Sequence, residues 1–303
     1  MNGHIINLFE FPSNLGLKKT DYAHEPGVKK LPDWLKQFGF HDQIKPDKVV
    51  RLDPPVYSML VDEASLVRNA DNIVVYAEGQ AALLYNEIKK DTFQLILGGD
   101  CSILVGSALA LKQKGKYGLF YLDGHTDFIW PEMSGTHGAA GMDLAIVAGH
   151  GHSKLTNIHD LNPYIQEEHI FCVGNREYDA DYEKPVIASN VAYFPLNRLR
   201  ENGLQNTVQQ FLQMVQLHNL DGFFIHFDVD ALDDRLMPAV DSRTEGGLSY
   251  EELAEVLIPL LASNKAIGME ITILDPDLDE DGRYTREFVT QMVHIFSAGM
   301  ITH

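Results

Sequence analysis

Short runs of apolar residues alternate along the chain with longer segments whose apolar positions recur at helical spacing. The runs predict about eight strands and the longer segments predict helices. Strands that are apolar on both faces and alternate with helices indicate a parallel sheet covered on both sides. The strands are expected near residues 4–9, 48–52, 93–97, 117–122, 169–173, 191–194, 222–228 and 265–271. The helices are expected near 66–90, 102–113, 203–218, 249–263 and 284–298.

The organisation of the chain predicts one α/β domain over residues 1–303. No linker, repeat or low-complexity tract interrupts the pattern. Ser249 followed by Glu252 has the spacing of a capping box and predicts where the helix 249–263 begins. Long segments follow two of the strands, at 128–141 and 174–185. Ligands of open α/β sheets bind outside the carboxyl ends of the strands, so these segments are the expected walls of a binding site.

Acidic residues and one histidine gather where two of the predicted strands end. Asp123, His125 and Asp127 follow the strand 117–122, while Asp228 and Asp230 end the strand 222–228. Side chains at every second position of a strand share a face, so these groups can converge. Carboxylates that converge repel one another unless divalent cations neutralise them. Hard oxygen ligands with one nitrogen suit Mn²⁺ or a similar borderline ion.

Two further strand ends carry chemistry. Gly98-Gly99-Asp100-Cys101-Ser102 forms a sharp strand-to-helix turn with Cys101 at its tip, and Gly268-Met269-Glu270 places a carboxylate on the last strand. In this order, the chain resembles the ureohydrolase family, which includes arginase, agmatinase and formiminoglutamase. That family carries a Gly-Gly-Asp-His-Ser turn, an Asp-x-His-x-Asp segment, a Phe-Asp-x-Asp segment and a Glu near the C-terminus. The resemblance spans nearly the whole chain and implies a three-layer α/β/α sandwich (arginase-like).

The resemblance implies two divalent metal ions, with manganese expected. It implies that Asp123 and Asp228 each contact both ions, that Glu270 grips the guanidinium of a substrate, and that Asp127 and His137 move protons. The implied metal ligands are Cys101, Asp123, His125, Asp127, Asp228 and Asp230.

Cys101 departs from the family pattern, which usually has a histidine at this position. Nearby cations would lower the pKa of the thiol and favour the thiolate, which is a good ligand. A soft sulfur ligand shifts the metal preference from Mn²⁺ toward Zn²⁺, Fe²⁺, Co²⁺ or Ni²⁺. A weakened first metal site, or a site with one ion only, are the alternatives. Relatives with this cysteine include a hydrolase of N-hydroxylated arginine. Cys172, inside a strand, is interpreted as a space-filling residue.

Two histidines have more than one interpretation each. His226 shares a strand face with Asp228. It is either a buried, hydrogen-bonded core residue or a partner that stands behind the metal ligands. His137 occupies the proton-shuttle position if the loop is aligned by Ser134 and Gly135, whereas alignment by Gly141 and Met142 puts Ala140 there; a solvated loop histidine is the further alternative.

The residues that hold the amino-acid end of arginine are poorly reproduced. Phe128 follows Asp127 where arginase has a small polar side chain. Glu177 and Asp179 are candidates to bind a substrate ammonium group, and they are equally well interpreted as surface charges. L-arginine is therefore not the obvious substrate, although the guanidino chemistry is retained.

Composition limits the partners. The formal net charge of −19 argues against nucleic acid and anionic membranes, and it favours a small cationic guanidino substrate, although a solvated acidic surface explains it equally well. Two cysteines, no apolar run of membrane-spanning length and no signal-like N-terminus predict a cytoplasmic protein. The resemblance implies a homo-oligomer, a trimer or hexamer.

The resulting hypothesis is a dinuclear metal-dependent hydrolase that splits a C–N bond of a guanidino compound and releases urea or a urea analogue. The alternatives within the fold are a hydrolase of hydroxyarginine or of a formimino compound, and a non-catalytic paralogue whose first metal site is impaired. A metal-dependent deacetylase of related fold, with one zinc ion, would leave Asp230 and Glu270 unexplained.

Overall fold

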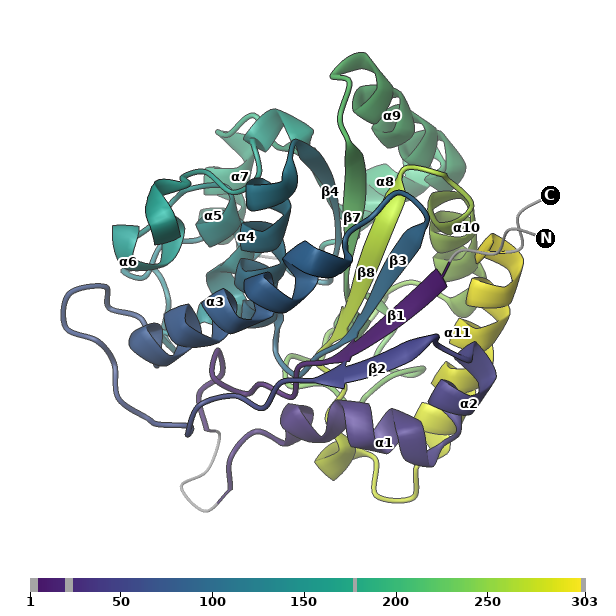
Figure 1. The fold of residues 1–303 in the computed structure, drawn as a ribbon, viewed down its shortest axis with the longest axis horizontal. Coiled ribbons are helices and arrows are strands. Elements are labelled where there is room, and N and C mark those ends of the chain that lie inside the picture. The colour runs from purple at the N-terminus through teal and green to yellow at the C-terminus, as the bar shows by residue number, and fades with distance from the viewer. Residues whose placement is uncertain (1–4, 20–23, 177–178, 301–303) are drawn as a thin grey trace.

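The computed structural model describes residues 5–19, 24–176 and 179–300, and its centre is one parallel sheet (Figure 1). Eight strands follow the order β2-β1-β3-β8-β7-β4-β5-β6, and every neighbouring pair runs parallel. β3, β4, β5 and β7 are buried along their whole length, as expected for strands covered on both faces. The strands are β1 (Ile5–Glu10), β2 (Lys48–Arg51), β3 (Thr92–Leu97), β4 (Tyr117–Leu122), β5 (Ile170–Val173), β6 (Ala192–Phe194), β7 (Gly222–Asp228) and β8 (Ala266–Thr272).

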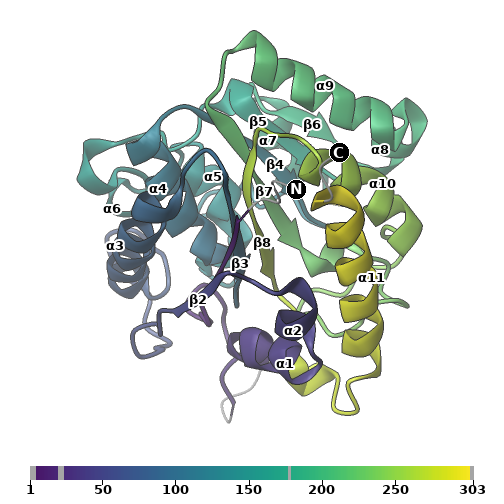
Figure 2. The ribbon, with the colours of Figure 1, turned by 45° about the vertical axis from the view of Figure 1, so that its right-hand side comes forward.

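Helices cover both faces of the sheet and complete a three-layer α/β/α sandwich (Figures 1 and 2). One face carries α3 (Ala70–Glu87), α4 (Leu104–Lys114), α5 (Asp143–Val147), α6 (Ser153–Thr156) and α7 (Ala180–Ile187). The other face carries α1 (Leu31–Gln37), α2 (Phe40–Ile44), α8 (Leu196–Asn202), α9 (Leu204–Leu217), α10 (Tyr250–Leu261) and α11 (Arg283–Met300). No helix in the described part of the chain is long and apolar enough to cross a membrane.

The predicted fold class is confirmed, and each of the eight predicted strands corresponds to an observed one. The capping box is also present: the Ser249 side chain accepts from the Glu252 backbone, and Glu252 accepts from the Ser249 backbone. Six short helices were not predicted, because four to eight residues are too few to show a helical period. One of them, α7, occupies the end of the segment 174–185, which was expected to be loop throughout.

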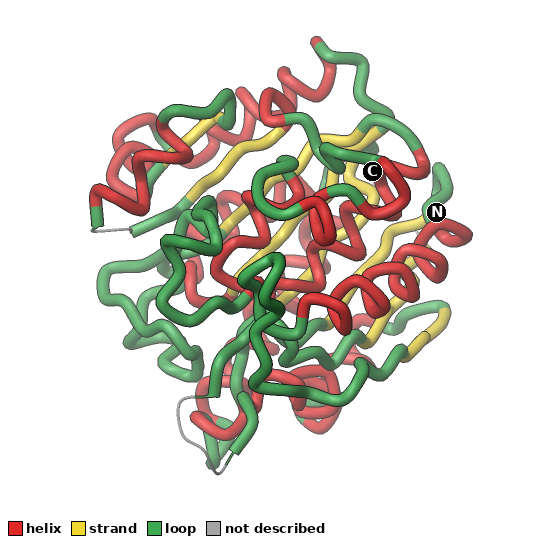
Figure 3. The backbone as a smooth tube through the Cα atoms, turned by 90° about the vertical axis from the view of Figure 1, so that its left-hand side faces the viewer, coloured by secondary structure: helices red, strands yellow, loops and turns green. Residues whose placement is uncertain are grey.

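Four neighbouring strands in the middle of the sheet, β3, β8, β7 and β4, carry the residues of the predicted site. β3 and β4 are consecutive in the chain, yet β8 and β7 lie between them in the sheet. The strand order therefore reverses its direction of growth between β3 and β4. Most of the loops, green in Figure 3, gather on the side toward which β1 runs from the N-terminus, which is where the parallel strands end. Strand order therefore brings the metal-binding motifs to one edge of the sheet.

Candidate metal centre

Cys101 is placed by a tight turn between β3 and α4. Asp100 ends the extended backbone, and its side chain accepts from the Ser102 backbone at 2.9 Å and from the Ser13 hydroxyl at 2.8 Å. Gly99 lies against the Ser13 carbonyl, where any Cβ atom would collide with the backbone. The turn thus needs glycine, and it leads directly into the short 3-10 helix Cys101–Ile103 that points the buried thiol over the strand ends.

The loop after β4 carries Asp123, His125 and Asp127. Asp123 is fully buried, and its Oδ1 accepts from the His125 backbone. The His125 ring donates through Nδ1 to Asp230 Oδ2 at 2.9 Å and keeps 23% of its surface exposed. Gly124 donates its backbone N–H to the other Asp230 oxygen at 2.9 Å. Strand ends β4 and β7 are therefore joined by direct contact between their predicted ligands.

Asp228 connects the end of β7 to the thiol. Cys101 Sγ donates to Asp228 Oδ2 at 2.9 Å and lies 3.2 Å from the Thr272 hydroxyl on β8. The second Asp228 oxygen accepts from the Asp230 backbone at 2.8 Å. Both aspartates are almost fully buried, at 3% exposure each.

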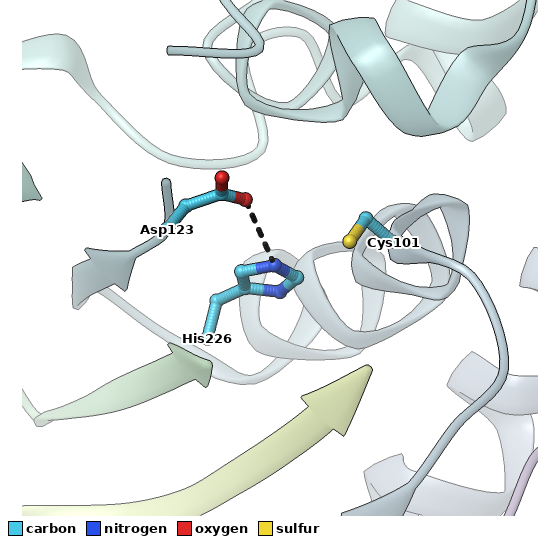
Figure 4. A group of neighbouring side chains, drawn as sticks. All are labelled: Cys101, Asp123 and His226. Carbon is cyan, nitrogen blue, oxygen red and sulfur yellow. Dashed lines mark ion pairs between the residues drawn. The ribbon is translucent and has the colours of Figure 1, made fainter. Parts of the chain in front are cut away.

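Two groups of side chains have the spacing of a metal site. Cys101, Asp123 and His226 form one group, and Asp123, His125 and Asp230 form the other; within each, the ligand atoms lie within 4.8 Å of one another. Asp123 belongs to both, so one carboxylate stands between two adjacent cation positions. Figure 4 shows the first group: one ring nitrogen of His226 faces Asp123, and the Cys101 thiol points toward the His226 ring. The donor set of carboxylates, imidazole and thiol fits divalent ions.

Burial sets the electrostatics of the metal-free cluster. It raises the pKa of Asp123 and Asp228 well above their ordinary values, and neighbouring carboxylates raise it further. Burial also raises the pKa of Asp127, to about 7. Burial would raise the pKa of Asp230 too, but attraction to His125 lowers it. Without cations, burial and mutual repulsion thus favour the protonated form of Asp123, Asp127 and Asp228.

The Cys101 thiol follows the same rule. Burial raises its pKa well above the usual range, and the charge of Asp228 raises it further. The expected lowering requires bound cations; without them the thiol keeps its proton and donates it to Asp228. Metal binding must therefore displace that proton.

A second row of side chains lies directly beneath these ligands. Tyr121, His226 and Glu270 are register neighbours on β4, β7 and β8. The Tyr121 and His226 rings stack, with centroids 4.5 Å apart and planes 5° from parallel. His226 Nδ1 lies 2.7 Å from Glu270 Oε1, and Ser107 on α4 donates to Glu270 Oε2 at 2.7 Å. His226 is thus buried and hydrogen-bonded, which agrees with the first of its two interpretations, and its ring also belongs to the group with Cys101 and Asp123.

Glu270 has contacts other than those expected of a residue that grips a substrate. It is fully buried, and both carboxylate oxygens accept hydrogen bonds from within the chain. A guanidinium that used both oxygens would have to share them with Ser107 and His226. The role assigned to Glu270 by resemblance stays a prediction.

Asp127 adopts a left-handed backbone conformation, φ 42°, at the edge of the cluster. The Tyr121 hydroxyl lies 3.0 Å from Asp127 Oδ2 and 2.9 Å from Asp143 Oδ1. Asp143 is a fully buried carboxyl whose pKa burial raises well above its ordinary value. Asp143 was not predicted as a site residue, because it begins the short helix α5, just beyond the expected loop 128–141, where no motif marks it.

His137 lies in the loop after β4 with its ring Nδ1 3.0 Å from the Leu66 carbonyl. In the same loop, a Cβ at Gly141 would stand 3.9 Å from Asp127 Oδ1. The role of His137 stays a prediction, and so does the choice between the two alignments of this loop. Asp179 caps α7 by accepting from the Asp181 backbone at 2.8 Å; Glu177 lies outside the described residues.

Arg176 and Asn175, just after β5, hold the ligand loops in place and were not predicted to do so. Arg176 is buried and donates to the carbonyls of Asp230, Ala231 and Thr244 at 2.8, 3.2 and 3.0 Å. Asn175 donates to the carbonyls of Asp123 and His125. Both side chains bind backbone, and a sequence carries no signal for that choice of partner.

Replacing Arg176 with methionine should lower the free energy of unfolding by at least about 3 kcal/mol, because three carbonyls lose a charged donor. Metal affinity should fall as well, since the loop that carries Asp230 is no longer fixed. Urea denaturation and metal titration on the same preparation measure both. Arg235→Met is the matched control: that side chain is 84% exposed and pairs with Asp233, so its loss should cost under about 1 kcal/mol. Equal effects of the two substitutions would contradict the assignment.

Residues 27–297 match the Arginase family, and the chain belongs to that family. Arginase from Staphylococcus aureus strain MRSA252 is 27% identical over 301 residues, which is 98% of each chain. Among solved structures, arginase from Bacillus caldovelox has a TM-score of 0.83 at 25% identity, covering 97% of this chain and 98% of that one. Formimidoylglutamase from Bacillus subtilis shares the fold, with a TM-score of 0.74 at 24% identity over 98% and 87% of the two chains.

Proposed function

We propose that this chain is a dinuclear metal-dependent hydrolase that splits a C–N bond of a guanidino compound and releases urea or a urea analogue. The observation that carries the proposal is the shared position of Asp123 between the two metal-binding groups. One carboxylate between two adjacent cation positions is the arrangement that a dinuclear hydrolase needs. Membership of the Arginase family supports the same class of reaction.

Divalent ions, when bound here, supply Lewis acidity and lower the pKa of water toward neutrality. The ligands proposed for them are Cys101, Asp123, His125, Asp127, Asp228 and Asp230. Asp127 is the proposed proton carrier between the attacking water and the departing amine. The Tyr121 hydroxyl fixes one of its oxygens at 3.0 Å, and the other faces Gly141, which leaves space beside it. The acidic chain, with net charge −19, attracts a cationic substrate.

A second candidate is a hydrolase of an N-hydroxylated guanidine or a formimino compound. The internal hydrogen bonds of both Glu270 oxygens favour it, because they occupy part of the capacity of this carboxylate to accept from an unsubstituted guanidinium. A non-catalytic paralogue, with an impaired first metal site, is the outcome if no compound reacts. The proposed homo-oligomer, a trimer or hexamer, is tested by light scattering.

The test is metal analysis of the purified protein, followed by assays with arginine, agmatine, N-hydroxyarginine and formiminoglutamate. Urea, hydroxyurea and formamide are measured separately, so that each product identifies its substrate class. Close to two ions per chain and release of one product support the proposal. Two ions with no product from any compound would contradict the hydrolase assignment while leaving the metal centre in place.

Replacing Cys101 with serine should shift metal preference from Zn²⁺ toward Mn²⁺. Serine keeps the size of the side chain and can still donate to Asp228, but it removes the soft ligand. The ratio of Zn²⁺ to Mn²⁺ affinity should fall at least about tenfold. Calorimetric titration with each metal measures it. Cys172→Ser is the matched control, since this buried thiol lies in β5 and donates to Asn175 instead. An unchanged ratio for Cys101→Ser would mean that the thiol is not a ligand.

A further inference from the structure

His226 has one ring nitrogen bound and one free. Nδ1 lies 2.7 Å from Glu270 Oε1, and because a carboxylate accepts, Nδ1 is the nitrogen that donates in this pair. In the tautomer with its hydrogen on Nδ1, Nε2 presents a lone pair, and Nε2 is buried without any hydrogen-bond partner. Buried polar atoms are nearly always satisfied, so an orphan of this kind requires an explanation.

The nearest candidate partner is also an orphan. Asp123 Oδ2 is buried and unpaired, and it lies 3.9 Å from His226 Nε2. That separation is too long for a hydrogen bond. It fits two ligands of one ion, because zinc–nitrogen and zinc–oxygen bonds of about 2.0–2.2 Å place such ligands about 3–4 Å apart. The thiol of Cys101 belongs to the same group of atoms, all within 4.8 Å (Figure 4).

The side chains around His226 fix the orientation of its ring in the way expected for a metal ligand. Tyr121 stacks on one face of His226, Glu270 binds Nδ1, and Ser107 fixes Glu270 from α4. Histidines that ligate metals commonly donate their other nitrogen to a carboxylate, which sets the tautomer and raises the basicity of the ligand. All three supporting side chains come from the interior, so the free nitrogen faces the strand ends.

We propose that His226 is a direct metal ligand and that Cys101, Asp123 and His226 form a thiolate–carboxylate–imidazole site selective for Zn²⁺ over Mn²⁺. The neighbouring group of Asp123, His125 and Asp230 lacks sulfur and suits Mn²⁺. In place of a histidine at position 101, His226 on β7 thus provides the imidazole ligand, from beneath the strand ends. Glu270 then orients His226 and does not contact substrate. The proposal builds on the metal centre of the proposed hydrolase and predicts two chemically different sites.

X-ray absorption of metal-free protein loaded with one equivalent of Zn²⁺ tests the site directly. The expected spectrum has one sulfur at about 2.3 Å and imidazole nitrogen at about 2.0 Å. Of the two groups found among the described residues, the one that contains Cys101 has both kinds of ligand, and its histidine is His226. A spectrum with neither sulfur nor imidazole would overturn the proposal, and this measurement requires no variant to fold.

Affinity measurements on variants make the second test. In competition with a chelator, His226→Gln should weaken Zn²⁺ binding at least about 100-fold, and Glu270→Gln, which removes the orienting charge, about 10–100-fold. Mn²⁺ binding at the other site should change far less. His41→Gln is the matched control: His41 is also buried on a carboxylate, 2.9 Å from Glu10, but lies outside the cluster.

The outcomes separate this proposal from the proposed function. Unchanged Zn²⁺ affinity in folded His226→Gln would overturn the ligand assignment, even if a guanidino compound is hydrolysed. If the protein shows the expected sulfur and imidazole ligands but hydrolyses no compound, the ligand assignment holds and the proposed hydrolase function is wrong.

Discussion

Asp123→Asn should abolish binding of both metal ions and, with it, all hydrolytic activity. Asp123 is the one side chain common to the two metal-binding groups, and it is fully buried. The amide keeps the shape of the carboxylate but removes a negative charge from each cation position, and metal affinity depends on deprotonated, anionic ligands. Metal content by mass spectrometry of the dialysed protein, together with activity, measures the effect.

Asp279→Asn is the control for this substitution. Asp279 is also a buried aspartate, but its Oδ2 accepts from the Thr285 backbone and hydroxyl at the start of α11, and it belongs to neither metal-binding group. Its loss should lower thermal stability without changing metal content. If Asp123→Asn protein retained two ions per chain, Asp123 would not be a shared ligand, and the proposed dinuclear arrangement would be wrong.

Metal loading should stabilise the protein more at pH 8 than at pH 6. Burial raises the pKa of Asp123, Asp127 and Asp228 in the folded, metal-free chain, to about 7 for Asp127. A carboxyl with a raised folded pKa contributes stability below its unfolded pKa, and that stability is lost as pH rises toward the folded value. The metal-free protein therefore weakens between about pH 4 and pH 7, or higher, while bound cations neutralise the same carboxylates.

The pKa of Asp230 shifts in the opposite direction, but this shift does not cancel the loss of stability between pH 6 and pH 8. Attraction to His125 lowers its pKa despite burial, so its contribution is complete above about pH 4 and constant from there upward. Thermal melts of metal-free and metal-loaded protein at both pH values should differ by at least about 4 °C more at pH 8, which corresponds to about 2 kcal/mol for a domain of this size. Asp127→Asn, which cannot ionise, should reduce the difference. An equal gain at both pH values would contradict the role of the buried carboxylates.

The sheet could be predicted from the sequence because its strands are buried on both faces. A run such as Tyr117–Leu122 has no polar position to suggest a solvent-facing side, so it indicates a central parallel strand on its own. Asp123, His125, Asp228 and Asp230 could be predicted to converge because residue types and strand ends are both visible in a sequence. The structure brings these four side chains together.

Partners that depend on side-chain direction could not be predicted. Glu270 is fixed by Ser107, which lies 163 residues earlier in the chain on α4, and no local pattern links the two. The direction of His137 depends on a loop in which that residue itself has a positive φ of 55°. Sequence identifies which groups are available, whereas the packing of helices on the sheet decides which of them remain free for a ligand.

The exposure of His125 has a consequence for how the centre fills. Cys101, Asp123 and His226 are between 0% and 1% exposed, whereas His125 keeps 23% of its side chain in solvent. We expect an ion bound by the Cys101–Asp123–His226 group to exchange with solvent more slowly than an ion bound beside His125, because the ligands of that group are almost fully buried. The order in which the two positions lose their ions to a chelator measures this difference.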